Sequence, residues 1–337
     1  MFKDYPLMKT NKGSVPMFYP HIPKKTLKAL KKVFSGRWIG EGPLVDLFEK
    51  KFAYKFTKNL PCVAVGSGTD ALHLSYLLAG IKKNDEVICP VFTCTATNIP
   101  LLYIGAKIKF ADIDPDTFNI SLNHVKKLIT KKTKAIVFVN YGGLPCDLEE
   151  LNKIAKKNKI KLIQDAAQSL GSTYKKKPIT EYADFSIFSF QAIKHISSGD
   201  GGLLCFKDKK LLKLAKRIRW FGIDRAKKQG GTWENDIKEI GYKYQMTDIG
   251  ASILIEALKE ILTDANFQID NTEIKFELVR AMLPHVPFDG WTWVAMENGA
   301  VDIGFEKTKT ENKRINVYKN LFHNGAIDFI EVFSEII

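Results

Sequence analysis

The chain has 337 residues, of which 45% are hydrophobic and 26% are charged, and these fractions are those of an ordinary folded protein. Its length is sufficient for one large α/β domain and a smaller unit. The formal net charge is +14, but the lysines are scattered in ones, twos and threes. This scatter is typical of solvated helices and turns, so nucleic acid is not an expected partner. No apolar run approaches the length of a membrane span.

Cysteine and histidine usage indicates neither a disulfide framework nor a metal site. The five cysteines have no paired spacing, and the six histidines lie far apart in the sequence. The first residues lack the basic and then apolar pattern of a secretory signal. We therefore expect reduced thiols, no metal and a cytoplasmic protein.

The first part of the chain predicts two helices joined by a glycine-rich loop. The helices are expected over residues 24–34 and 44–54, and the loop over residues 36–43 contains Trp38. An aromatic residue in such a loop forms either a wall of a substrate site or a lid over the core. The sequence leaves both interpretations open.

From residue 61 onward, short apolar runs alternate with helical segments. This alternation predicts an α/β fold with a mostly parallel sheet covered on both faces, in three layers. The predicted strands span residues 63–65, 86–89, 108–113, 135–140, 161–164, 185–190 and 203–206. Helices are expected over residues 70–79 and 148–158, and a threonine-rich helix start over residues 92–97.

The first of these strands leads into a glycine turn, Gly66–Asp70. A glycine turn that feeds a helix places free backbone N–H groups and the positive end of the helix dipole at one point, which suits a phosphate. Alternatively, Thr69 or Asp70 only caps the helix.

An acidic residue, Asp165, follows the strand at 161–164, so it lies at the strand end where ligands bind in open α/β sheets. It is either a helix cap or the partner of a bound cation. Further along, Lys194 lies between two apolar runs, in a segment that ends in Gly199–Gly202. Burial would lower the pKa of this lysine and make its amine a nucleophile, whereas a solvated loop lysine would have no such role.

Together, the glycine turn, Asp165 and Lys194 form the set that pyridoxal phosphate requires. The phosphate needs N–H donors and hydroxyls, the ring nitrogen needs a carboxylate, and the aldehyde needs a lysine amine. The lysine amine can then move a proton as base and acid.

Several motifs resemble those of the DegT/StrS family of sugar aminotransferases. They are Gly66–Leu72, Asp112–Thr117, Asp165–Gln168, Phe188–Gly202 and Gly241–Ile249, and the likeness covers about residues 15–262. The resemblance implies fold type I of the pyridoxal-phosphate enzymes and a homodimer with shared sites. It also implies transfer of an amino group, usually from glutamate, to a nucleotide-linked keto-sugar.

The resemblance also implies roles for individual residues. Lys194 would bind the cofactor covalently, and Asp165 would pair with the pyridine nitrogen. Gln168 would lie near the ring, and Ser189 with the backbone of Gly68 and Thr69 would hold the phosphate.

The chain departs from the commonest family pattern at a few positions. Cys94 stands where an aromatic residue usually stacks on the cofactor, Lys243 where the partner subunit usually offers an asparagine to the phosphate, and Gln191 where histidine or asparagine is usual. Cys94 should weaken cofactor binding somewhat, and Lys243 can serve as a point charge for the phosphate.

The likeness to the aminotransferases fades after residue 262, so we divide the chain into a large domain, 1–262, and a helical C-terminal segment, 263–337. Helices are expected near residues 273–283 and 293–301, separated by a proline-rich break. The segments 283–292 and 321–326 resemble the start of the ubiquinone-biosynthesis accessory proteins that bind lipids and have TetR-like helices. A divergent helical domain is the alternative interpretation.

The leading hypothesis is therefore a pyridoxal-phosphate-dependent aminotransferase of a nucleotide-linked keto-sugar. A second hypothesis is a homologue that binds the cofactor but is catalytically impaired, because the usual small domain is absent. A third is a fusion whose tail has a regulatory, nucleic-acid-binding or lipid-binding role.

Overall fold

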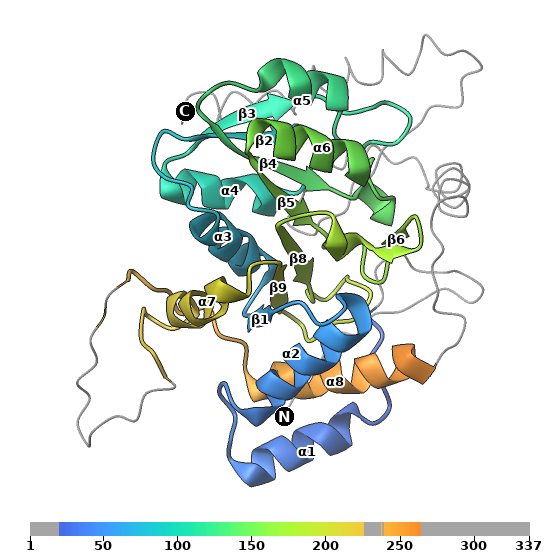
Figure 1. Ribbon diagram of the computed structural model, residues 1–337. Coiled ribbons are helices and arrows are strands. Elements are labelled where there is room, and N and C mark those ends of the chain that lie inside the picture. Colours follow the sequence, from blue (N-terminus) through green and yellow to red (C-terminus); the bar gives the residue numbers. More distant parts are fainter. Residues whose placement is uncertain (1–19, 226–236, 238, 264–337) are drawn as a thin grey trace, which may run out of the picture.

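The computed structural model describes residues 20–225, 237 and 239–263 (Figure 1). A seven-stranded sheet forms its centre, in the order β1-β9-β8-β5-β4-β2-β3. All strands run parallel except β9, which is antiparallel to both of its neighbours. The strands are β1 (Cys62–Val65), β2 (Glu86–Pro90), β3 (Lys107–Ala111), β4 (Thr133–Val139), β5 (Lys161–Asp165), β8 (Phe185–Ser189) and β9 (Gly202–Phe206), and a separate hairpin pairs β6 (Thr173–Tyr174) with β7 (Lys177–Pro178).

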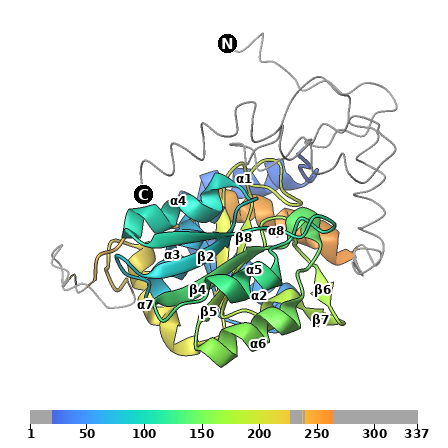
Figure 2. The ribbon, with the colours of Figure 1, turned by 90° about the horizontal axis from the view of Figure 1, so that it is seen from above.

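Helices cover both faces of this sheet (Figure 2). One face packs against α3 (Gly68–Leu78), α4 (Thr95–Ile104) and α7 (Leu212–Arg219). The other packs against α2 (Pro43–Phe56), α5 (Leu122–Leu128), α6 (Leu148–Asn158) and α8 (Asp248–Thr263), and α1 (Thr26–Gly36) lies against α8. The predicted three-layer fold with a mostly parallel sheet is thus confirmed.

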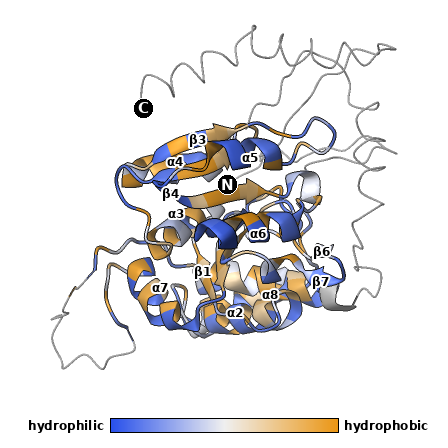
Figure 3. Ribbon diagram, turned by 45° about the horizontal axis from the view of Figure 1, so that its top comes forward, coloured by the Kyte–Doolittle hydropathy of each residue, from blue (hydrophilic) through white to orange (hydrophobic). Residues whose placement is uncertain are grey.

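The sequence pattern explains why each element packs as it does. Strands β1, β2, β4 and β9 are nearly continuous runs of buried residues, as expected when both faces of a sheet are covered. By contrast, α6 buries a single stripe, formed by Leu148, Leu151, Ile154 and Ala155, and Figure 3 shows its outward side as hydrophilic. This spacing of three and four residues is that of an amphipathic helix.

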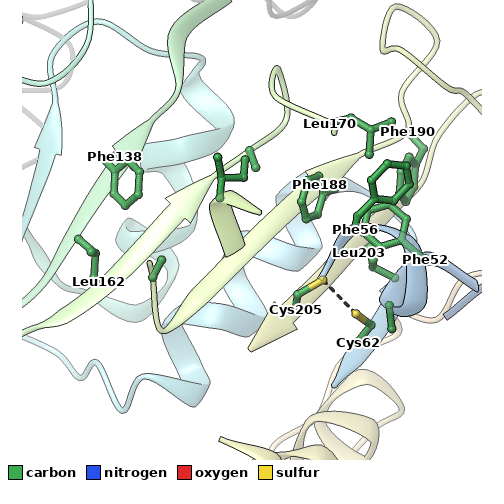
Figure 4. Close-up of a cluster of buried hydrophobic side chains, with 14 of the residues drawn as sticks. Phe52, Phe56, Cys62, Phe138, Leu162, Leu170, Phe188, Phe190, Leu203 and Cys205 are labelled. Atoms are coloured by element: carbon green, nitrogen blue, oxygen red, sulfur yellow. Dashed lines mark hydrogen bonds between the residues drawn. The ribbon is translucent and has the colours of Figure 1, made fainter. Parts of the chain in front are cut away.

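Phenylalanine side chains fill the core on the α2 side of the sheet (Figure 4). The ring of Phe52 lies 4.9 Å from that of Phe188 and 6.0 Å from that of Phe190, centroid to centroid. Nearby, the buried Sγ atoms of Cys62 and Cys205 are 3.0 Å apart on paired strands, and both carry free thiols. Aromatic pairs at such separations stabilise a core beyond the area that they bury.

Some predicted boundaries and elements differ from the structure. Helix α3 begins at Gly68 rather than at residue 70, because the side chain of Ser67, and not of Thr69 or Asp70, caps it by accepting a hydrogen bond from the Asp70 amide. Helices α5, α7 and α8 were not predicted. The lid interpretation of Trp38 is wrong, since its side chain is 58% exposed and its indole N–H donates to the carbonyl of Glu41 at 3.0 Å.

Helix α8 extends to Thr263, the last described residue, so the predicted domain boundary after residue 262 is not tested. The helices expected near residues 273–283 and 293–301 lie outside the described residues, as does the resemblance to the lipid-binding accessory proteins. The division into a large domain and a C-terminal segment therefore stays a prediction.

Candidate functional site

A cavity of about 220 Å³ lies at the carboxyl ends of the parallel strands. This is the edge at which open α/β sheets bind ligands. Every site residue predicted from the sequence lines this cavity except Lys243. The lining consists of Ser67, Gly68, Thr69, Leu72, Thr93, Cys94, Ala96, Val139, Tyr141, Asp165, Ala167, Gln168, Ile187, Ser189, Gln191, Lys194 and Asp200.

One end of the cavity is formed by the N-terminus of α3. The amides of Gly68 and Thr69 belong to the first turn and have no partner within the helix. Glycine is needed here because a Cβ on Gly68 would lie 2.9 Å from the Cβ of Ser189, and a Cβ on Gly202 would lie 2.1 Å from the carbonyl oxygen of Ser67. The missing side chains let the helix N-terminus approach β8 and β9 closely.

The carboxylate of Asp165 lines the cavity at the end of β5, and only 4% of the residue is exposed. The hydroxyl of Thr97 donates to its Oδ2 at 2.8 Å, and the amide of Ala167 donates to its Oδ1 at 3.1 Å. The hydroxyl of Thr93 lies 2.7 Å from that of Thr97. Burial raises the pKa of Asp165 above its ordinary value. The hydrogen bonds from Thr97 and Ala167 and the charge of Lys194 oppose this shift only in part.

Lys194 reaches the same cavity from the loop between β8 and β9. Its backbone amide donates to the carbonyl of Gln191 at 2.9 Å, which fixes the turn that carries it. Burial lowers the pKa of Lys194, and the nearby Asp165 and Cys94 oppose that shift only in part. A larger fraction of the amine is therefore neutral, and nucleophilic, than in a solvated lysine.

Cys94 and Gln168 line other walls of the cavity. Burial raises the pKa of the Cys94 thiol, so it stays protonated and contributes a small apolar surface. The Oε1 of Gln168 accepts a hydrogen bond from the amide of Gly142 at 2.7 Å, which ties the loop after β5 to the loop after β4.

Lys243 lies elsewhere in this chain. Its side chain is exposed and its Nζ is 3.6 Å from the centroid of the Trp220 ring. Cation–π attraction of this kind holds a lysine in a fixed direction at a surface. Its predicted contact with the phosphate of a partner subunit therefore stays a prediction.

Sequence reasoning missed Thr93, Thr97 and Tyr141. Thr93 and Thr97 are four residues apart, with Thr93 just before α4 and Thr97 in its first turn. That spacing is the one signal that could have linked them. The hydrogen bond from Thr97 to Asp165 joins residues 68 positions apart in the sequence, which no local pattern records.

The lining residues fit pyridoxal phosphate, the cofactor predicted from the sequence. The first turn of α3 and the hydroxyl of Ser189 provide hydrogen-bond donors. They lie close together, since a Cβ on Gly68 would be 3.2 Å from the Ser189 hydroxyl. Phosphates bind at such helix N-termini. A buried carboxylate and a partly neutral amine lie further along the same cavity, as the ring nitrogen and the aldehyde of the cofactor require.

The described residues form neither a metal site nor a membrane-spanning helix. Within residues 20–225 and 239–263 there is no group of three or more His, Cys, Asp or Glu side chains that could hold a metal ion. In the same part of the chain, no helix has the length and apolar character to cross a membrane.

A sequence model described as the DegT/DnrJ/EryC1/StrS aminotransferase family matches residues 20–286. Among curated relatives, an uncharacterized protein of Methanocaldococcus jannaschii is 37% identical over 250 residues, and the spore coat polysaccharide biosynthesis protein SpsC of Bacillus subtilis is 33% identical over 251 residues. Each alignment covers 73% of this chain and 64% of the relative, so the chain spans less than two thirds of the length of these proteins.

A solved structure, the sugar aminotransferase CalS13 from Micromonospora echinospora, is similar with a TM-score of 0.69 and 28% identity. The similarity covers 74% of this chain and 69% of that one. The family match ends at residue 286 rather than at residue 262, where the resemblance was expected to fade.

Proposed function

The chain belongs to the DegT/DnrJ/EryC1/StrS aminotransferase family, and on this basis we propose that it is a pyridoxal-phosphate-dependent aminotransferase. The amino group moves from glutamate to a nucleotide-linked keto-sugar. The observation that carries the proposal is the presence of Lys194 and Asp165 in one cavity that the N-terminus of α3 closes at one end.

Each of these groups has a task that follows from its surroundings. When bound, pyridoxal phosphate supplies an electron-poor ring that stabilises negative charge on the carbon beside the transferred nitrogen. Asp165, oriented by Thr97 and Ala167, would keep a proton at the ring nitrogen. The Nζ of Lys194 would hold the aldehyde of the cofactor, and as an amine that is partly neutral it could take up and return a proton within the cavity.

The remaining groups hold the cofactor in place. Ser189 and the amides of Gly68 and Thr69 bind the phosphate at the helix N-terminus. Gln168 would lie near the ring, and Cys94 would stand where an aromatic residue usually stacks on it.

The charges in the cavity support a shared site in a homodimer. Of the described residues that line the cavity, Lys194 is the one cation, and it is engaged with the cofactor. The carboxylates of glutamate and the diphosphate of a nucleotide-linked sugar need further cations. In our proposal a partner subunit supplies them, with Lys243 next to the cofactor phosphate.

Family relatives support a sugar as the acceptor. The relative from Bacillus subtilis is a spore coat polysaccharide biosynthesis protein, and CalS13 is a sugar aminotransferase. We also place the protein in the cytoplasm, which agrees with its five free thiols.

The alternative function is that of a homologue that binds the cofactor without completing the transfer. The two differ in one result, because only the aminotransferase reacts with glutamate.

Covalent attachment to Lys194 tests the cofactor assignment. The full chain incubated with pyridoxal phosphate should show a visible absorbance band, and borohydride reduction followed by peptide mass mapping should place the adduct on Lys194. The Lys194→Ala variant should show neither. Lys207→Ala is the matched control, because desolvation also lowers the pKa of Lys207 but this residue does not line the cavity. A colourless wild-type protein would refute the proposal.

A further inference from the structure

Three aromatic rings meet beside the cavity, on the side away from the phosphate-binding turn. The centroids of Phe92 and Tyr141 are 4.9 Å apart, and Phe118 lies 5.8 Å from each of them. All three residues are only partly buried, so they are not part of the closed core. We call this cluster the aromatic wall.

Each ring of the wall comes from a different loop at the carboxyl edge of the sheet. Phe92 follows β2, Phe118 follows β3 and Tyr141 follows β4, and these strands are neighbours in the order β4-β2-β3 (Figure 1). The phosphate-binding turn lies instead beside β8 and β9, at Ser189 and Gly202. Of the three rings, that of Tyr141 lines the cavity, and it follows β4 rather than β8 or β9.

The loops hold the wall by specific contacts. The side chain of Asn119 is buried, accepts a hydrogen bond from the Tyr141 amide at 2.9 Å and donates to the carbonyl of Leu144 at 3.1 Å. Next to it, Phe118 has φ 57°, in the left-handed region that bulky residues rarely adopt. The turn at Asp114 maintains this conformation, since the Phe118 amide donates to the Asp114 carbonyl at 2.8 Å.

Strain of this kind persists where the surrounding structure over-determines it, and it is concentrated at binding sites. In this loop the strain presents the Phe118 ring to Phe92 and Tyr141. The Asn119 contacts and the ring contacts together fix the position of the Tyr141 ring at the cavity.

The chemistry of the wall distinguishes between the two substrates. An aromatic face packs well against the C–H groups of a hexose ring, which is apolar on its faces and polar at its edge. The same surface offers no cation to the carboxylates of glutamate. The acceptor sugar must also enter this cavity, because its keto carbon reacts next to Lys194.

We propose that Tyr141 is the binding platform for the hexose ring of the acceptor, and that Phe92 and Phe118 are positioning residues that hold its ring. This inference rests on the function proposed above and adds a specificity element to the same site. It assigns recognition of the sugar to the aromatic wall and recognition of glutamate to other groups.

The test compares the two half-reactions of the full chain loaded with cofactor. The first is followed as a function of glutamate concentration, and the second by mixing the aminated enzyme with UDP-linked and dTDP-linked keto-deoxyhexoses. Tyr141→Leu should raise the half-saturating sugar concentration about fivefold to tenfold, the size expected for one lost aromatic contact, and leave that of glutamate unaltered. Tyr141→Phe retains the ring and should stay within about threefold of the wild type.

Phe118→Asn separates positioning from a structural role. Asparagine adopts the left-handed conformation more readily than phenylalanine, so the thermal midpoint should be equal or higher, while the half-saturating sugar concentration should rise about twofold to threefold. Tyr54→Leu, at a 76% exposed residue on α2 that does not line the cavity, is the control in which neither substrate is affected.

Three results would refute different parts of the proposal. An equal rise for glutamate and sugar in Tyr141→Leu, or no rise for the sugar, refutes the platform and leaves the proposed function intact. A wild type that reacts with glutamate but with none of the sugars refutes the proposed acceptor and the platform with it. A wild type that does not react with glutamate refutes the transamination itself.

Discussion

Two neighbouring residues of β8 face different parts of the molecule. Phe188 is 2% exposed and packs into the phenylalanine cluster on the α2 side of the sheet, whereas Ser189 lines the cavity. The alternation of side chains along a strand produces this division. The same strand thus contributes to the core through one residue and to the candidate site through the next.

The two regions differ in how burial is used. On the α2 side, apolar burial and ring contacts stabilise the fold. At the cavity, Asp165 and Thr97 are buried and hydrogen-bonded, and burying a charged group costs free energy that its partners return only in part. We therefore expect that stability and chemistry can be changed separately in this protein.

The largest effect on stability should follow from Phe52→Ala. Phe52 is fully buried among Phe48, Phe56, Phe188 and Phe190. The loss of its ring and the void that remains should lower the free energy of unfolding by about 3–5 kcal/mol. Urea denaturation measures this change. Tyr54→Ala, at an exposed residue of the same helix, should stay within about 0.5 kcal/mol of the wild type. An equal loss of stability in both variants would contradict the assignment of stability to the buried phenylalanine cluster.

The converse experiment is Asp165→Asn. The substitution keeps the shape of the side chain but removes the charge that faces the cavity, so the rate of reaction with glutamate should fall by roughly 10²–10³-fold. Stopped-flow absorbance measures this rate. The thermal midpoint should not fall, because a neutral amide is less costly to bury than a carboxylate; a rate close to that of the wild type would count against Asp165 as the partner of the ring nitrogen.

A smaller effect is expected from His73, a buried polar residue of α3 outside the cavity. Its Nδ1 is 2.9 Å from the Tyr244 hydroxyl, its Nε2 has no hydrogen-bond partner in the described structure, and burial lowers its pKa from 6.5 to about 4. The unfolded chain therefore takes up this proton first as the pH falls. The stability that neutral His73 contributes is complete above about pH 6.5 and is lost as the pH falls toward 4.

Between pH 7 and pH 5 the free energy of unfolding should fall by about 2 kcal/mol because of His73. His73→Asn keeps a polar partner for Tyr244 but has no proton to gain. Urea denaturation of the wild type and the variant at both pH values measures the difference. Identical pH dependence in the two proteins would show that His73 is not responsible.

Local patterns in the sequence were sufficient for much of the fold and of the candidate site. Asp165 ends an apolar run, Lys194 lies between two such runs, and Gly68 belongs to a glycine turn before a helix, so each could be placed from its immediate neighbours. Helices α5 and α7 escaped prediction because they are short, at 7 and 8 residues, and rich in lysine.

What could not be predicted depends on contacts between distant segments. The hydrogen bond from Thr97 to Asp165 joins residues 68 positions apart, and that from Tyr141 to Asn119 joins residues 22 positions apart. Both need the strand order, which the apolar pattern does not encode. The aromatic wall depends in addition on the left-handed conformation of Phe118. That conformation is usually predicted from a glycine, and this position holds a phenylalanine.

The most direct test of the central claim is the reaction of the cofactor-loaded full chain with glutamate, followed by visible absorbance. We expect the band of the lysine-bound cofactor to disappear while the keto acid of glutamate forms in an amount equal to the cofactor bound. A band that persists at saturating glutamate, with no keto acid formed, would contradict the account and identify the chain as a cofactor-binding homologue without aminotransferase activity.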